Sequence, residues 1–397
     1  MEHDAHKEVA TIHPVYVGYL GFAGQIPWAM ILVHLPMLEP VVGGKIFSFA
    51  VGIAMGVACN IVRFAVLMYG RSFTFNSRVV VGSIMSALFT FGYFVLYMGQ
   101  IEAGSLGVSS PGFWLGLGLA LFGGAGNAQL LSTGYGIASM VASDNPVANN
   151  LFFLGQAAAS TSCWPLKHAM TTITSNHGIH LGVSMGFISL VSLSAIPVFF
   201  KKISGKLAIP NQQKITCADC ARIMRQTMFP SIVLWLSFMF TNLVTPGQVM
   251  RWGLPSTVSS ASDIVTNEQL YLSLCLYVNL LADAVGRCMC VLLASNRNRF
   301  SKIIASRYIS LLLVALVLIR ASIAPFFYAP PSTDWGRFIL LCVFGFIHGV
   351  AVSLALSLGS ARVAKSDSDL AGYLSSFTII SGLLMGSIGG IVIRVIT

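Results

Sequence analysis

Charged residues are scarce in this chain, and the shortage excludes an ordinary soluble fold. Only 9% of its 397 residues are Asp, Glu, Lys or Arg, whereas 55% are hydrophobic. A soluble protein needs a charged exterior around its core, and average soluble domains carry about 25% charged residues. The composition therefore predicts a polytopic membrane protein.

Alternating polarity is also absent from the hydrophobic runs, which argues against a transmembrane β-barrel. Residues 49–59 and 311–319 are apolar on every face, whereas barrel strands alternate between apolar and polar side chains. We predict an all-α protein with eleven transmembrane helices. The expected spans are residues 16–38, 46–70, 79–101, 113–142, 148–174, 179–200, 227–249, 269–295, 303–328, 337–360 and 370–395.

The cysteines do not form a metal-binding framework. All eight are scattered, and Cys217 and Cys220 make a lone Cys-x-x-Cys pair. A structural zinc site needs about four ligands, and no second pair lies nearby. We expect no metal and no other cofactor.

The net charge of +10 comes from basic residues that punctuate the hydrophobic runs, so a nucleic-acid partner is not expected. The even-numbered junctions between spans hold Arg71, Arg78, Lys201, Lys202, Lys206, Lys214, Arg222, Arg225, Arg297, Arg299, Lys302, Arg307, Arg362 and Lys365. The odd-numbered junctions hold only Lys45, Arg251 and Arg337. By the positive-inside rule, the N-terminus is cytoplasmic and the C-terminus, after eleven spans, is extracytoplasmic.

The longest polar interruption divides the spans into six and five. We expect a cytoplasmic N-terminal tail over residues 1–15, a six-helix bundle over 16–200, a cytoplasmic linker loop over 201–226 and a five-helix bundle over 227–397. Two-bundle transporters have this organisation and bind their substrate near the membrane midplane, between the bundles.

Asp283 and Arg287 lie inside an apolar stretch that runs from about Gln269 to Arg297. Asp283 is 14 residues from each end of that stretch, or roughly 21 Å at 1.5 Å per residue. The two residues are four positions apart and share one face of a helix. Charges at this depth usually mark a transport pathway. The alternative is a buried ion pair that only fixes helix register.

Two other spans carry polar or aromatic side chains at a similar depth. Trp28 follows Pro27, which removes a backbone donor, and its indole could stack on a planar ligand. Gln129 lies in a glycine-rich segment, and its amide could pair with the edge of a heterocycle. Helix packing is the alternative for Trp28, and an interhelical hydrogen bond is the alternative for Gln129.

Three further basic residues lie within the expected spans. Arg63 is eight residues from Arg71 and can snorkel towards the cytoplasm, and Lys167 can snorkel the other way. Arg320 is too deep to snorkel easily and needs a carbonyl, a carboxylate or the substrate as its partner. Lys167 and Arg320 are therefore candidates for a substrate or gating role.

In its order of motifs, the sequence resembles the equilibrative nucleoside transporters. The matching segments are Pro27-Trp28, Gln129 with Gly134, Asp283-x-x-Gly286-Arg287, Arg320 with Pro325, His348-Gly-Val-Ala-Val-Ser-Leu, Gly359-Ser-Ala-Arg-Val and Ala371-Gly-Tyr. The eighth-span motif departs from better-known members: Leu280 stands where they have an Asn, and Asn279 lies one residue earlier. In the first span, Ala29 replaces a frequent Asn, and Leu32 stands where a larger apolar side chain can line the site.

The resemblance implies a fold similar to that of the major facilitator group, and facilitated transport of nucleosides, sometimes nucleobases, with purines as the leading class. It implies a substrate site of Trp28, Leu32, Gln129, Asn279, Asp283 and Arg287, in a monomeric, multi-pass protein of the plasma membrane. Membrane lipid and a small-molecule substrate are the expected partners. The alternative is a major-facilitator-type permease for another polar or anionic solute, with or without proton coupling. An enzyme is not expected, because no cluster of His, Asp or Cys lies at one depth.

Overall fold

The computed structural model describes residues 12–42, 45–103, 110–174, 176–207, 215–244, 249, 252 and 268–396. Those residues form helices and turns without a strand. The first half contains α2 (Pro14–Val42), α3 (Lys45–Tyr69), α4 (Phe75–Ala103), α5 (Pro111–Ala142), α6 (Val147–Ile173) and α7 (His177–Lys202). The second half contains α8 (Cys217–Val244), α9 (Glu268–Ser295), the short α10 (Arg297–Ala305), α11 (Tyr308–Ile323), α12 (Asp334–Ala361) and α13 (Ser368–Ile396).

Local sequence signals set several helix boundaries. Ser110 caps α5, because its hydroxyl accepts a hydrogen bond from the amide of Phe113, and a proline occupies the first helical turn. Asn176 caps α7 and Thr333 caps α12 in the same way. Within the region expected as a linker loop, α8 already begins at Cys217, ahead of the predicted span start at residue 227.

Nine helices in the described part of the chain are long and apolar enough to cross a membrane. The helices α5 and α6 are also long but are not among the nine. Both lie in the middle of the molecule, where α5 packs on α2, α3, α4, α6 and α13, and α6 packs on α2, α5 and α9. Neighbouring protein replaces lipid around them, so they tolerate more polar side chains. The count of eleven spans and the sidedness of the termini stay predictions.

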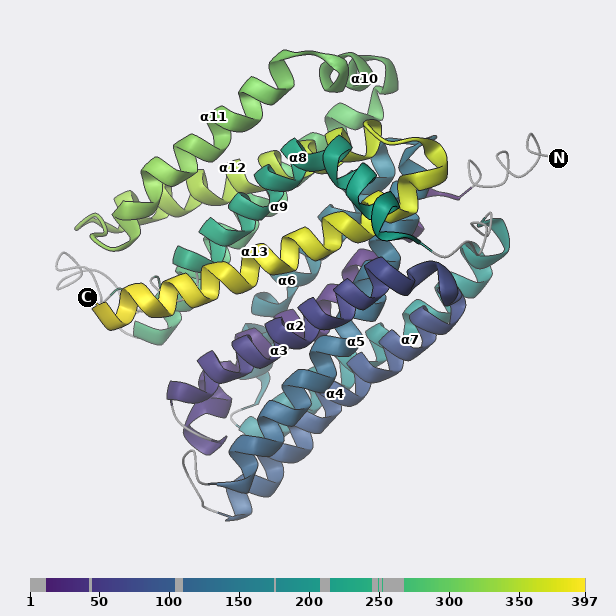
Figure 1. Ribbon diagram of the computed structural model, residues 1–397. Coiled ribbons are helices and arrows are strands. Elements are labelled where there is room, and N and C mark those ends of the chain that lie inside the picture. The colour runs from purple at the N-terminus through teal and green to yellow at the C-terminus, as the bar shows by residue number, and fades with distance from the viewer. Residues whose placement is uncertain are drawn as a thin grey trace.

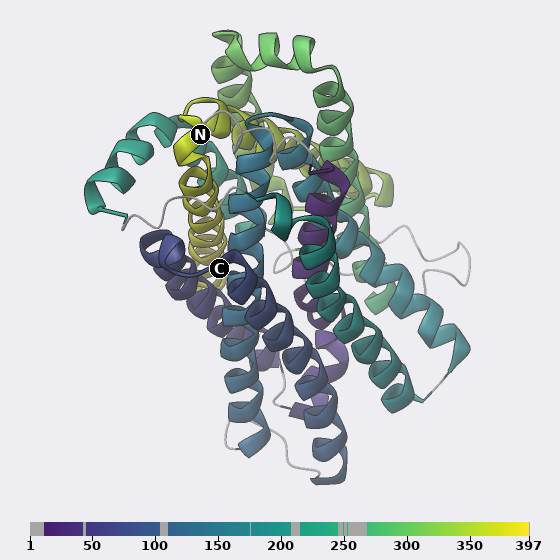
Figure 2. The ribbon, with the colours of Figure 1, turned by 90° about the vertical axis from the view of Figure 1, so that its right-hand side faces the viewer.

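The helices form two groups that follow the two halves of the chain (Figure 1). In that view, α8 to α13 lie in the upper part, whereas α2, α3, α4, α5 and α7 lie in the lower part. The halves meet where α13 packs on α3 and α5, and where α9 packs on α6. Figure 2 shows the same groups turned by 90°.

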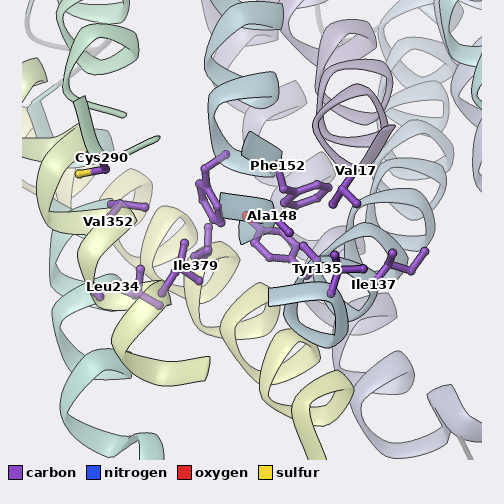
Figure 3. Close-up of a cluster of buried hydrophobic side chains, with 14 of the residues drawn as sticks. Val17, Tyr135, Ile137, Ala148, Phe152, Leu234, Cys290, Val352 and Ile379 are labelled. Atoms are coloured by element: carbon purple, nitrogen blue, oxygen red, sulfur yellow. The ribbon is translucent and has the colours of Figure 1, made fainter. Parts of the chain in front are cut away.

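The buried core joins the halves towards one end of the molecule. The largest cluster combines residues from all the described α-helices except α3, including Tyr135, Phe152, Leu234, Val352 and Ile379 (Figure 3). It reaches Leu207 and Phe300, which lie at the predicted cytoplasmic end. Towards the other end, one cluster belongs to the first half apart from Ile380 and Leu383 of α13, and another belongs to the second half. Apolar packing therefore holds the halves together mainly at the predicted cytoplasmic end.

Candidate functional site

Asp283 and Arg287 form a two-point ion pair on α9. The Arg287 Nε donates to Asp283 Oδ1 at 2.9 Å, and Nη2 lies 2.7 Å from Oδ2. Both side chains are buried. The four-residue spacing brings the two groups together on one helical face, and the fork of the guanidinium matches the carboxylate. The pairing predicted from the spacing is confirmed.

Two glycines of α12 press the backbone of that helix against this face of α9. A side chain at Gly349 would collide with the carbonyl oxygen of Asp283, and one at Gly345 would collide with that of Asn279. The absence of a Cβ at these two positions is therefore needed for the close approach. It fixes the position of Asn279 and Asp283 relative to α12.

Arg287 also connects the two halves. Its Nη1 donates to the backbone carbonyl of Phe153 on α6 at 2.9 Å, and its guanidinium carbon lies 5.4 Å from the centre of the Phe153 ring. The ion pair is thus held by one helix of each half. A change in the distance between α6 and α9 would alter the surroundings of the carboxylate.

Arg320 is fully buried, with an exposed fraction of 0%, and its contacts lie inside the second half. Its Nη1 donates to the Ser237 carbonyl at 2.5 Å and lies 3.0 Å from His348 Nδ1, while its Nη2 donates to the Thr241 hydroxyl at 2.9 Å. The guanidinium carbon lies 4.1 Å from the Phe344 ring centre. Since the arginine donates to Nδ1, that nitrogen carries the lone pair of a neutral imidazole.

The role of His348 was missed from the sequence, where it was noted only within the His348-Gly motif. The structure gives both residues of this motif a position beside a buried charge, with His348 on Arg320 and Gly349 on the backbone of Asp283. A histidine inside an apolar span was the signal that could have indicated it.

Gln129 and Asn279 present unpaired amide oxygens. Among the described residues, no hydrogen-bond donor reaches Gln129 Oε1 or Asn279 Oδ1, although both atoms are buried. A buried acceptor without a partner costs about 1–3 kcal/mol, so such atoms call for an explanation. A polar ligand that reaches these two oxygens would supply the missing donors.

Trp28, Leu32 and Lys167 lie in the first half, away from the described contacts of the ion pair. Trp28 is half-buried and packs on the apolar cluster of α2 to α7. Leu32 is 38% exposed. Lys167 Nζ donates to the Val33 carbonyl of α2 at 2.9 Å, so it joins α6 to α2.

Arg63 does not snorkel to the membrane surface as expected. It is 3% exposed, and its Nη1 donates to the Ser376 carbonyl of α13 at 2.8 Å. Its Nη2 lies 3.5 Å from Asn127 Oδ1 on α5. The local sequence did not reveal these partners, because both lie on other helices. Arg63 is therefore a link across the interface and not an anchor at its edge.

Ion pairs join the halves at the predicted cytoplasmic end. Arg71 donates to Asp369 through Nε at 3.0 Å and through Nη2 at 2.7 Å. Lys365 Nζ donates to Asp144 Oδ1 at 2.7 Å. Beside them, Arg78 donates to the Tyr373 hydroxyl at 2.7 Å. Each of these contacts pairs a residue near α3, α4 or α5 with one near α13.

Towards the predicted extracytoplasmic end, the contact between α6 and α9 is aromatic. The rings of Trp164 and Tyr277 stack with their centres 4.8 Å apart, and Trp164 also stacks on His168. Stacked rings separate without leaving a buried charge unpaired.

The fold and the buried polar residues between its halves define a membrane transporter. The family model described as "Nucleoside transporter" matches residues 203–395. This match covers just under half of the chain and supports an assignment to the nucleoside transporter family, in agreement with the resemblance predicted from the motifs.

Solved structures of low sequence identity share the fold. A variant of the E. coli fucose:proton symporter FucP aligns with a TM-score of 0.60 and 12% identity, over 96% of this chain and 92% of that chain. FucP in the outward conformation, a Major Facilitator Superfamily transporter, aligns with a TM-score of 0.62 and 13% identity, over 98% and 92% of the two chains. The comparison with curated proteins found no match.

Proposed function

We propose that this protein is an equilibrative transporter of nucleosides, with purine nucleosides as its main substrates, that works by alternating access in the plasma membrane. The carrying observation is the Asp283–Arg287 pair, which is bound to both halves, together with the unpaired amide oxygens of Asn279 on the same helix and Gln129 on α5. A polar, uncharged ligand with several hydrogen-bond donors complements that set.

A nucleoside offers suitable groups. Each oxygen of Asp283 accepts one bond from Arg287 and keeps lone pairs for the two ribose hydroxyls. The amide oxygens of Gln129 and Asn279 would accept from N–H groups of the base. Trp28 and Leu32 would supply the apolar wall against which a planar base stacks. In this proposal, Arg320 is a structural group of the second half, and Lys167 is a structural group of the first.

Transport would proceed as the two halves rock about the substrate site around Asp283. The closed end is the one where Arg71 binds Asp369 and the shared core is thickest. Opening there would break these contacts. The likeness to an outward-facing fold supports the same direction of access.

The ion pair also favours transport without proton coupling. Protonating Asp283 would weaken both of its contacts with Arg287 and leave a buried cation without its counter-charge, which costs about 3–5 kcal/mol. Coupled transport of another solute is the second candidate. The structural likeness to a fucose:proton symporter is the observation that favours it.

Uptake into proteoliposomes tests both candidates. Purified protein is reconstituted with equal pH on both sides, and radiolabelled adenosine, inosine, uridine, hypoxanthine and glucose are offered in turn. We expect nucleosides to equilibrate without a gradient, with excess cold nucleoside competing. Uptake of glucose but not of nucleosides would contradict the proposal, as would nucleoside uptake that requires an inward proton gradient.

A further inference from the structure

Gln156 on α6 is a buried amide that none of the site predictions included. It is 9% exposed, and its Oε1 accepts a hydrogen bond from the Tyr135 hydroxyl at 3.4 Å. Among the described residues, its Nε2 has no acceptor. A buried N–H group without a partner is uncommon and calls for one.

The position of Gln156 on its helix directs it towards the opposite half. Phe153, three residues earlier, accepts the bond from Arg287, and Trp164, eight residues later, stacks on Tyr277. Residues separated by three, four and seven or eight positions share a helical face. Gln156 therefore lies on the stripe of α6 that faces α9.

The ring of Tyr135 lies close both to the Gln156 amide and to residues at the buried arginines Arg63 and Arg287. Its centre lies 5.1 Å from that of Phe153, and the guanidinium carbon of Arg63 lies 6.0 Å from it. The Tyr135 hydroxyl holds one end of the Gln156 amide, so the other end, the N–H donor, has a defined direction.

The three amides that keep an unpaired atom, those of Gln129, Asn279 and Gln156, differ in the kind of partner that they lack. Gln129 and Asn279 lack a donor, whereas Gln156 lacks an acceptor. A 6-oxopurine carries both complements on adjacent atoms, because O6 accepts and N1–H donates. A 6-aminopurine carries the same groups in exchanged positions, since its exocyclic amine donates and its N1 accepts. An N–H group aimed at the exocyclic position therefore meets an acceptor in a 6-oxopurine and a second donor in a 6-aminopurine.

Resting on the proposed nucleoside transport, we infer that Gln156 determines specificity by donating its Nε2–H to the oxo group of 6-oxopurine substrates. The protein then prefers inosine and guanosine to adenosine. One hydrogen bond gained or mismatched in a buried site changes the preference by about tenfold.

The test is the ratio of inosine to adenosine uptake by one protein preparation, which is independent of how much protein folds. We expect wild-type protein to favour inosine by about tenfold. Gln156→Met removes the donor at similar volume and should bring the ratio close to one. Ser162→Ala is the matched control, because Ser162 is exposed on the same helix and its hydroxyl is satisfied by the Ala159 carbonyl; it should keep the wild-type ratio.

A measurement on the wild-type protein does not depend on any variant. Purine riboside lacks the substituent at C6, so it should inhibit inosine uptake about tenfold more weakly than guanosine does. In Gln156→Met, the two inhibitors should become similar.

The outcomes separate the two proposals. Nucleoside uptake with a ratio that Gln156→Met leaves unchanged overturns the specificity role and leaves nucleoside transport standing. Equal inhibition by purine riboside and guanosine in the wild type overturns it as well. Absence of any nucleoside uptake by folded wild-type protein overturns both.

Discussion

The interface between the halves differs between its predicted cytoplasmic end and its middle. At the end, Arg71 and Lys365 each have a charged partner in the other half, Asp369 and Asp144, and Arg78 donates to the Tyr373 hydroxyl. In the middle, buried amides of Gln129 and Gln156 each keep an atom without a protein partner among the described residues.

The difference indicates two separate tasks. Once this end opens to water, its ion pairs can break and re-form with a modest change in free energy, because water then replaces the lost partner. Unpaired amides in the middle are costly until a ligand supplies the missing groups. The end is therefore suited to closing a path, and the middle to binding what travels along it. The predictions below test this division, from the largest expected effect to the smallest.

The first prediction concerns the side of the membrane that the charged end faces, and its labelling test has an all-or-none result. Cys217 is exposed at the start of α8 and lies near this end in the sequence-based topology. A membrane-impermeant maleimide should label Cys217 only from the cytoplasm, and a cysteine added after Arg394 only from outside. The double variant Cys217→Ser, Cys220→Ser provides the background. Labelling of both positions from one side would contradict the eleven-span topology.

Exchanging the charges of the central pair should nearly abolish uptake. Asp283→Asn and Arg287→Ala each leave a buried partner unmatched, at about 3–5 kcal/mol, and should lower expression. The swap Asp283→Arg with Arg287→Asp restores a pair but moves the carboxylate one turn, about 5.4 Å, and removes the donor to Phe153. We expect surface expression to recover while uptake stays near background. Normal uptake by the swapped protein would show that the ion pair has only a structural role.

Removing the unpaired amide of α5 should weaken binding without unfolding the protein. Gln129→Ala deletes a side chain whose oxygen has no described donor, so stability should change little, whereas the half-saturation concentration should rise about tenfold. Kinetics of uptake, normalised to surface expression, measure this. Leu121→Ala, on the exposed face of the same helix, is the control. Unchanged kinetics in both Gln129→Ala and Trp28→Ala would show that these two residues have only a packing role.

Weakening the charged end should increase opening there several-fold. Asp369→Asn removes the buried carboxylate that Arg71 binds twice, and each 1 kcal/mol lost from the closed state corresponds to roughly fivefold in the open population. A reporter at Ser139→Cys, buried where α5 meets Ser360 of α12, should react faster with maleimide in a background lacking Cys217 and Cys220. Asp219→Asn changes an exposed pair within α8 and should have no effect. Equal rates in all three proteins would exclude a gating role for Arg71.

The scarcity of charge and the long apolar runs were sufficient to predict an all-α membrane protein, because backbone buried in lipid must form helices or closed barrels, and runs that are apolar on every face fit only helices. The Asp283–Arg287 pair was also predictable, since its geometry depends only on a spacing of four residues within one helix. The order of short motifs predicted the family.

Only the tertiary structure decided which partners lie on other helices. Arg287 reaches Phe153 and Arg63 reaches Ser376 across 134 and 313 residues of sequence, and no local pattern encodes such distances. The same holds for Gln156, whose significance lies in an unpaired atom rather than in its type. Composition and periodicity determine which segments become helices and which faces are apolar. The packing of those faces determines which polar atoms find a partner and which remain open to a substrate.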